Sequence, residues 1–321
     1  MPKYFDTIRN IRSLIICVLI SFSIFFNSCS SPKSFEFTEG KLQIESAEIY
    51  YKIIGHGIPT FVLHGGPGDS HSTMLQLTDL ADQYKLIFYD QRAAGRSTGD
   101  ADTALHTVAQ FVDDLEQLRL KLAPEKINII GGSWGAMLAM QYASKYSQNI
   151  NAMVLMSSMG VSSEYFDSYR SNIEKHRTPE DSLALIQITS TENFKKRIPE
   201  TIEKFWRLYF RSYFYNPDFT DSIKLWIRDT TYKSVPGRYA KLWEFFSDYD
   251  IREDLKAISC PTLILYGDHD PTPLEWVKPI HESIAESQLR IIKNAGHWLW
   301  VEAPDQIFPL IRSFLNSKNL P

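Results

Sequence analysis

Cysteine is scarce in this sequence, with three among 321 residues. Cys17 lies in an apolar stretch near the N-terminus and Cys29 follows that stretch, so Cys260 is alone in the rest of the chain. One thiol cannot form an internal disulfide, which excludes a disulfide-stapled scaffold. Cys260 precedes a proline and an apolar run, and we expect it to be a packed thiol at the edge of a strand.

Positive charge is not in excess either. Lys and Arg number 34 against 38 Asp and Glu, which gives a formal net charge of −4. This balance lacks the basic footprint of nucleic-acid-binding proteins, so we expect no nucleic-acid partner. No metal-ligand spacing occurs in the sequence, and we expect neither a metal nor another cofactor.

The apolar run near the N-terminus, Leu14–Phe26, is shorter than the stretch of about 20 residues that a bilayer-spanning helix needs. It follows a basic start and precedes small residues, which is the pattern of an export signal. The sequence Phe26–Cys29 resembles a bacterial lipobox, whose cysteine is lipidated and becomes the new N-terminus. We therefore predict a lipoprotein-type signal peptide at residues 1–28, a lipid on Cys29, and an exported protein anchored to a membrane of the cell envelope. The alternatives are a plain secretory signal and a short membrane anchor.

After residue 35 short apolar runs alternate with helical patterns. Uninterrupted apolar strands are typical of a mostly parallel sheet that is buried on both faces. Strands that alternate with helices predict a doubly wound α/β sheet, in which ligands bind beyond the carboxyl ends of the strands. The clearest runs are Thr60–Leu63, Lys85–Tyr89, Ile127–Ile130, Ala152–Met156 and Thr262–Tyr266.

Residues 159–251 interrupt this alternation. The stretch is helical in character, has no strand-like run and is rich in aromatic side chains. We predict a first part of the sheet domain at 35–158, a helical cap at 159–251, and a second part of the sheet domain at 252–318. The cap aromatics are expected either to form an apolar slot for substrate or to pack the cap helices onto the sheet.

A nucleophile elbow is predicted at Gly131–Gly135, which reads GGSWG and matches G-x-S-x-G. The apolar run before it and the helical pattern after it supply the strand–turn–helix context that the motif requires. A serine hydroxyl in that turn becomes a nucleophile when a base takes its proton. We predict Ser133 as the nucleophile; an inert serine in a glycine-rich turn is the alternative.

The strand–turn–helix context resembles the α/β-hydrolase fold, whose triad follows the order Ser, Asp, His along the chain. His297 lies in a loop after the last strand-like run, and we predict it as the base. Asp270 is predicted to orient that base, because the acid of this fold usually lies three residues after a glycine such as Gly267 and shortly before a proline. Asp268 remains the alternative acid.

Two backbone N–H donors are expected to stabilise the oxyanion that forms on attack. Trp134, directly after the nucleophile, is predicted to supply one. The glycine-rich loop His64–Gly68 is predicted to supply the other from Gly66, with His64 bracing the loop. A phosphate-binding loop is the alternative for this segment, but it lacks the lysine and the spacing of a P-loop.

Three motifs in order resemble the proline iminopeptidase (prolyl aminopeptidase) family of α/β-hydrolases. They are His64–Gly68, Asp90–Ser97 and Gly131–Gly135. The second departs from the family at Ala93, where a glycine is usual. The resemblance implies a serine peptidase that removes an N-terminal proline or another small residue from peptides through an acyl-enzyme.

The resemblance also implies acidic side chains that bind the protonated N-terminal nitrogen of the substrate, because a desolvated ammonium needs a paired negative charge. In the family a glutamate often follows the catalytic aspartate, whereas Pro271 is found here. The candidates for this role are Glu174, Glu244, Asp248 and Glu275; surface charge is the alternative for each.

Two other functions remain open at this point. The same machinery would serve an esterase or amide hydrolase that acts on small uncharged acyl groups. A binding lipoprotein that kept the fold without catalysis is the third hypothesis, although all the triad positions and both oxyanion segments are filled.

Overall fold

The computed structural model describes residues 35–99, 104, 106–227 and 239–318. The chain divides into two units, residues 1–35 and 36–321, and all the described helices and strands belong to the second. The signal peptide predicted at 1–28 and the lipidation predicted at Cys29 lie outside the described residues. Within them, no helix is both long and apolar enough to span a bilayer.

An eight-stranded sheet forms the centre of the second unit, in the order β1-β2-β4-β3-β5-β6-β7-β8. β1 and β2 are antiparallel to each other, β2 is antiparallel to β4, and every later pair is parallel. The predicted mostly parallel α/β sheet is therefore confirmed. The strands are β1 Phe37–Ile44, β2 Ala47–Ile54, β3 Ile58–Leu63, β4 Tyr84–Tyr89, β5 Ile127–Gly132, β6 Ile150–Met156, β7 Thr262–Gly267 and β8 Ser287–Ile292.

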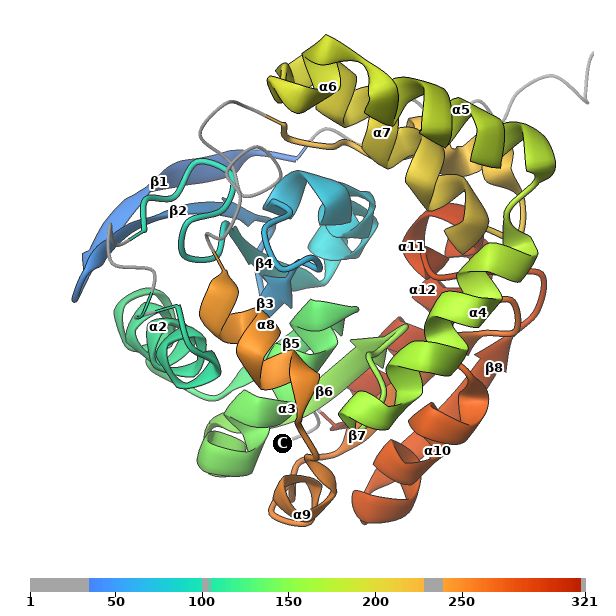
Figure 1. Cartoon of the computed structure of the whole chain (residues 1–321). Coiled ribbons are helices and arrows are strands. Elements are labelled where there is room, and N and C mark those ends of the chain that lie inside the picture. Colours follow the sequence, from blue (N-terminus) through green and yellow to red (C-terminus); the bar gives the residue numbers. More distant parts are fainter. Residues whose placement is uncertain (1–34, 100–103, 105, 228–238, 319–321) are drawn as a thin grey trace, which may run out of the picture. The chain divides into compact units, whose positions relative to one another are not determined.

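Helices surround this sheet (Figure 1). α3 packs on β5 and β6 and contacts α2 and α9, whereas α12 packs on β6 and β7 and contacts α11 and η1. The helices that pack around the sheet are η1 His71–Asp82, α2 Val108–Leu122, α3 Trp134–Tyr146, η3 Ser147–Asn149, α9 Arg252–Leu255, α10 Leu274–Ser283, α11 Leu299–Glu302 and α12 Pro304–Lys318.

In the insertion between β6 and β7, the described regular elements are helices, apart from one isolated β-bridge. Its first and last segments meet at an isolated antiparallel β-bridge between Ser162 and Asp250, so the two ends of the insertion lie side by side. The elements before α9 in this insertion are η4 Ser163–Tyr165, α4 Phe166–His176, α5 Pro179–Ser190, α6 Glu192–Lys195, α7 Pro199–Phe210, η5 Arg211–Tyr213, η6 Pro217–Ser222 and α8 Ala240–Ser247.

Local sequence signals account for several element ends. Thr107 caps α2, because its hydroxyl accepts the backbone N–H of Gln110. Thr178 caps α5 in the same way, and Pro179 occupies the first helical position, where a missing N–H costs nothing. β5 is buried along its whole length, as its continuous apolar run predicts, and Cys260 is a buried free thiol before β7.

Candidate active site

Ser133 occupies a sharp turn between β5 and α3. Its backbone has φ +56° and ψ −122°, in the left-handed region that few non-glycine residues adopt. The glycines of the motif are required by close backbone contacts. A methyl group on Gly131 would lie 2.4 Å from the carbonyl oxygen of Gly135, and one on Gly135 would lie 2.1 Å from that of Leu63. These contacts fix the turn and hold the serine at the carboxyl end of β5.

His297 and Asp270 form a buried pair in the loops after β8 and β7. Nδ1 of His297 donates to Oδ2 of Asp270 across 2.9 Å, and Oδ1 of Asp270 accepts the backbone N–H of Thr272 at 2.8 Å. Both side chains are almost fully enclosed. The structure therefore joins the predicted base to the predicted acid, in the geometry that fixes an imidazole ring and its tautomer.

Asp268, the alternative acid, has other neighbours. Its carboxylate lies 3.4 Å from the ammonium of Lys293 and accepts the backbone N–H of Ala295 at 3.5 Å. The histidine between the two aspartates, His269, stacks on His176 of α4 with ring centroids 4.0 Å apart. The acidic partner of His297 among the described contacts is thus Asp270.

A cavity of about 490 Å³ lies over the strand ends, and both Ser133 and His297 line it. Gly65 and Gly66 form part of the same wall. A methyl group on Gly65 would lie 3.2 Å from Cβ of Ser133, so the glycine loop runs directly against the serine. Three segments that are distant in sequence therefore meet on one surface.

The insertion supplies most of the opposite wall, and this wall is aromatic. Its rings include Phe166 and Tyr169 of α4, Trp206 and Tyr209 of α7, and Trp243 of α8. Edge-to-face and tilted contacts link many of these rings to their neighbours, which is the preferred packing of aromatic side chains. The aromatic side chains of the insertion thus both pack together and form an apolar slot.

The glutamates predicted to bind a substrate ammonium lie elsewhere. Glu174, Glu244 and Glu275 are exposed, and none of them lines the cavity. Glu244 pairs with Lys241 on its own helix at 2.6 Å. These three side chains, predicted for the ammonium site, therefore do not face the cavity that Ser133 lines. Asp248 is exposed as well.

Two charged side chains that the sequence did not single out do line the cavity, Asp69 and Arg170. Asp69 follows the glycine-rich loop directly and is almost fully buried, a position that its proximity to the motif could have suggested. Arg170 is exposed on α4 and lies 3.9 Å from Asp167. No sequence pattern distinguishes it from other surface arginines.

The glycine-rich loop has the backbone conformation that only glycine adopts readily. Gly66 has φ +114°, and a methyl group there would lie 2.6 Å from the amide nitrogen of Gly68. Trp134 is the first residue of α3, where backbone N–H groups have no partner within the helix. The two predicted oxyanion donors thus belong to segments that the fold brings together.

His64 braces this loop, as the sequence predicts. Its Nδ1 donates to the carbonyl oxygen of Gly65 at 2.9 Å, and its Nε2 accepts the backbone N–H of Gln91 at 3.0 Å. These two bonds require a neutral ring. Burial lowers the pKa of His64 below its usual value, which is consistent with that neutral state.

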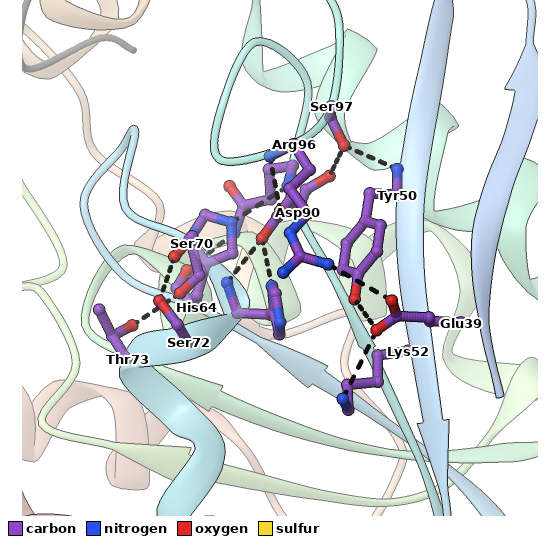
Figure 2. Close-up of polar contacts among 12 residues, drawn as sticks. Glu39, Tyr50, Lys52, His64, Ser70, Ser72, Thr73, Asp90, Arg96 and Ser97 are labelled. Atoms are coloured by element: carbon purple, nitrogen blue, oxygen red, sulfur yellow. Dashed lines mark hydrogen bonds and ion pairs between the residues drawn. The ribbon is translucent and has the colours of Figure 1, made fainter. Parts of the chain in front are cut away.

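Asp90 holds the far end of the loop. Its Oδ1 accepts both the backbone N–H and the Nδ1–H of His71, each at 2.7 Å, and its Oδ2 accepts the backbone N–H of Arg96. Figure 2 shows Asp90 within this network, with Arg96 and Tyr50 beside it. Burial alone raises the pKa of Asp90, but the interaction with His71 and the N–H of Arg96 outweigh burial and lower that pKa.

Glu302 secures the loop that carries His297. Its carboxylate accepts the backbone N–H of Gly296 at 2.7 Å and that of Asn216, in the insertion, at 2.8 Å. The backbone N–H of His297 itself donates to the carbonyl oxygen of Tyr213 at 2.7 Å. Burial raises the pKa of Glu302, although its backbone donors act in the opposite direction. The sequence analysis did not identify this link between the insertion and the histidine loop.

Among the residues that the structure describes, no three His, Cys, Asp or Glu side chains are grouped so that they could hold a metal ion. The polar groups of the site are instead a serine, an imidazole–carboxylate pair and backbone amides. Together these groups can carry out acyl transfer to a hydroxyl.

Comparison with known proteins agrees with this geometry. A family model for the alpha/beta hydrolase fold matches residues 59–304. A proline iminopeptidase of Lactobacillus helveticus (strain DPC 4571) is 31% identical over 298 residues, which cover 88% of this chain and 98% of that protein. A proline iminopeptidase of Saccharolobus solfataricus is 29% identical over 289 residues, which cover 87% of this chain and 92% of that protein.

A solved structure shares the fold. The crystal structure of proline iminopeptidase from Mycobacterium smegmatis superposes with a TM-score of 0.65 and 18% identity, and the match covers 88% of this chain and 98% of that chain. Sheet order, elbow, motif order and sequence similarity lead to one assignment. The chain belongs to the α/β-hydrolase fold family and, within it, to the proline iminopeptidase family.

Proposed function

We propose that this protein is a serine hydrolase that forms an acyl-enzyme on Ser133. In this mechanism Oγ of Ser133 bonds to the substrate carbonyl carbon while its proton passes to Nε2 of His297. The imidazolium then gives that proton to the leaving amine or alcohol, and water, activated by the same imidazole, hydrolyses the acyl-enzyme. Asp270 stabilises the imidazolium. The observation that supports this most directly is the buried His297–Asp270 hydrogen bond on the wall of the cavity that Ser133 also lines.

The backbone N–H groups of Gly66 and Trp134 are proposed as the donors to the tetrahedral oxyanion. Such donors act on charge that develops in the transition state, and the loss of one typically lowers kcat by about a hundredfold or more. The closeness of Gly65 to Ser133 supports this proposal, because a methyl group added to the glycine would lie 3.2 Å from Cβ of the serine.

The preferred substrate class is proposed to be peptides and amides with an N-terminal proline or another small apolar residue. Two features support it: the curated relatives are named proline iminopeptidase, and the cavity wall opposite the serine is aromatic. Aromatic rings match the apolar ring of proline, and they contribute contact area at little cost in conformational entropy.

An esterase or amide hydrolase that acts on uncharged acyl groups is the second candidate. It is favoured by one observation: among the described residues that line the cavity, Asp69 is the only carboxylate. An ammonium removed from water needs a paired negative charge, so a site with few carboxylates suits an uncharged acyl group better.

A chromogenic pair of substrates separates these candidates. We expect proline p-nitroanilide to be cleaved with a higher kcat/KM than p-nitrophenyl butyrate after correction for their uncatalysed rates. The reverse order would favour the esterase. If neither is cleaved and a fluorophosphonate fails to label Ser133, the serine-hydrolase proposal is wrong and a binding role remains.

We also infer that Cys29 carries a lipid that anchors an exported protein to a membrane of the cell envelope. The support is the sequence pattern alone, namely a basic start, an apolar run and a lipobox-like ending. The variant C29A, expressed in full length in a bacterial host, should move from the membrane to the soluble fraction, whereas C17A should stay with the membrane. An unchanged membrane fraction for C29A would rule out this anchor.

A further inference from the structure

Gln91 is the second residue after β4 and is buried, with 1% of its surface exposed. Its side-chain Nε2 donates to the carbonyl oxygen of His64 at 2.7 Å, and its Oε1 accepts the indole N–H of Trp134 at 2.7 Å. Its backbone N–H donates to Nε2 of His64 at 3.0 Å. One residue thus makes three hydrogen bonds to two segments of the site.

The strand order explains how Gln91 reaches both the glycine loop and the elbow. β3 lies between β4 and β5, so the glycine loop that follows β3 lies between the segment Asp90–Gln91 that follows β4 and the elbow that follows β5. Gln91 therefore extends past the loop to the elbow and bonds to both. Its two partners flank the proposed oxyanion donors: His64 lies two residues before Gly66, and Trp134 itself carries the other donor.

The loop and the elbow are also in van der Waals contact at this point. A methyl group on Gly135 would lie 2.7 Å from the carbonyl oxygen of His64, the same oxygen that accepts from Gln91. That carbonyl is therefore confined between the elbow backbone on one side and the amide of Gln91 on the other. A change at Gln91 would alter the spacing of the two segments, since no other side chain in the described hydrogen bonds joins His64 to Trp134.

We propose that Gln91 is a positioning residue that sets the distance between the two oxyanion donors, Gly66 and Trp134, by bonding to both segments at once. This inference rests on the proposed serine-hydrolase function. An amide fits this role because its nitrogen donates to the loop while its separate oxygen accepts from the elbow. A carboxylate would keep the bond from Trp134 but would place an oxygen against the carbonyl of His64. An aliphatic side chain would lose both bonds.

Asp90, the neighbour of Gln91, bonds to different segments of the site. Asp90 binds His71, at the far end of the loop, and the backbone of Arg96 (Figure 2), but neither of these belongs to the elbow. Gln91 is thus the residue of this pair that joins the loop to the elbow. Weakening Asp90 should loosen the loop as a whole, whereas weakening Gln91 should change the separation of the two donors.

The test compares Q91L and Q91E with the wild-type full chain, on the better of the two chromogenic substrates. We expect Q91L to lower kcat about 10- to 100-fold, as displacements of catalytic groups by about 1 Å do, with KM changed by less than about twofold. The affinity for a boronic acid that forms a tetrahedral adduct on Ser133 should fall by the same factor as kcat. The kcat of Q91E should fall less than that of Q91L, because the carboxylate still accepts the indole N–H of Trp134.

A matched control is N128L, which removes another fully buried side-chain amide, in β5, that bonds weakly to Thr60 at 3.4 Å and does not contact the loop. It should lower the melting temperature while kcat stays within about twofold of wild type. The variant W134F removes the indole donor and keeps an aromatic ring; added to Q91L, it should cause little further loss of kcat, because both break the same bond.

Several outcomes would overturn the inference. They are a kcat of Q91L within about twofold of wild type, a loss that appears in KM rather than in kcat and boronate affinity, or an equal loss of kcat in N128L. If Q91L does not fold, Q91E and W134F decide the matter by the same criteria. A wild-type protein that is neither active nor labelled by a fluorophosphonate would instead refute the serine-hydrolase function, and the inference with it.

Discussion

The two walls of the cavity are built in different ways. The sheet-side wall consists of loops at strand ends, where buried polar groups such as His64, Asp90 and Gln91 each make defined hydrogen bonds. Glycines in this wall are in backbone contact closer than any other residue allows. The wall from the insertion is made of rings in contact with rings, with Arg170 at its exposed part.

This difference assigns different tasks to the two walls. Hydrogen bonds and backbone contacts fix atoms to within fractions of an ångström, which acyl transfer requires. Apolar ring contacts are less directional, so a wall of this kind can change its shape by substitution without disturbing the reacting groups. We therefore expect changes on the sheet side to act on kcat and changes on the insertion side to act on KM and substrate preference.

The largest effect is expected for S133A. It removes the proposed nucleophile and keeps Cβ, so the turn with φ +56° gains no new contact. We expect kcat to fall at least about 10⁴-fold, measured on the preferred chromogenic substrate. The melting temperature should be unchanged, and S144A, on the same α3 helix, should retain wild-type activity. Substantial activity in S133A would place the chemistry elsewhere.

Next in size is the contrast between D270N and D268N. Asn at position 270 keeps the shape but no longer stabilises an imidazolium, and it favours the wrong tautomer of His297. We expect kcat to fall about 10⁴-fold in D270N and less than about fivefold in D268N, in steady-state assays near neutral pH. Equal losses would show that the two aspartates share the role.

A smaller effect is expected on the other wall. W206A removes a ring of α7 that lines the cavity, and F205A removes its neighbour on the same helix, which does not. We expect W206A to raise KM about five- to tenfold with kcat within about threefold, because apolar contact area is lost without a change at the reacting atoms. F205A should change KM by less than about twofold. A fall of kcat with unchanged KM in W206A would contradict the expectation that the insertion side acts on substrate binding.

The smallest effect concerns the stability of the sheet-side loop at acid pH. The pKa of Asp90 is lowered in the folded state below its usual 3.8, so its carboxylate stabilises the fold above that value and loses this contribution as pH falls through the folded pKa. Between about pH 5 and 2 the melting temperature of wild type should therefore fall more steeply than that of D90N. A difference of about 2–4 °C corresponds to about 1 kcal/mol in a domain of this size. D113N, an exposed control paired with Lys145, should follow wild type.

Local patterns predicted much of this molecule. The runs before the glycine loop, the elbow and the acid loop became β3, β5 and β7, because a strand buried on both faces must be apolar throughout. G-x-S-x-G predicted the turn at Ser133. Gly131 is required by the backbone of Gly135 within the motif, whereas Gly135 is required by the carbonyl oxygen of Leu63, which is distant in sequence. The choice of Asp270 over Asp268 also came from local spacing, and the structure pairs Asp270 with His297.

The sequence did not predict which charged side chains of the helices line the cavity. Glu174 and Glu275 are exposed and do not line the cavity, whereas Arg170 does. Arg170 and Glu174 are four residues apart and lie on the same face of α4, so the packing of α4 against other elements decides which of the two meets the cavity. Glu302 and Gln91 were missed for a related reason, because their partners are distant in sequence.

The sequence by itself determined the main strands, the elbow, the pairing of Asp270 with His297 and the family, because each depends on residue type and short-range spacing or on motif order. Tertiary structure alone decided two contacts across the site: the amide of Gln91 with the elbow, and the rings of the insertion with the space over Ser133. The physical reason is that hydrogen bonds and ring contacts between distant segments depend on how strands are ordered and helices are turned, which no local pattern encodes.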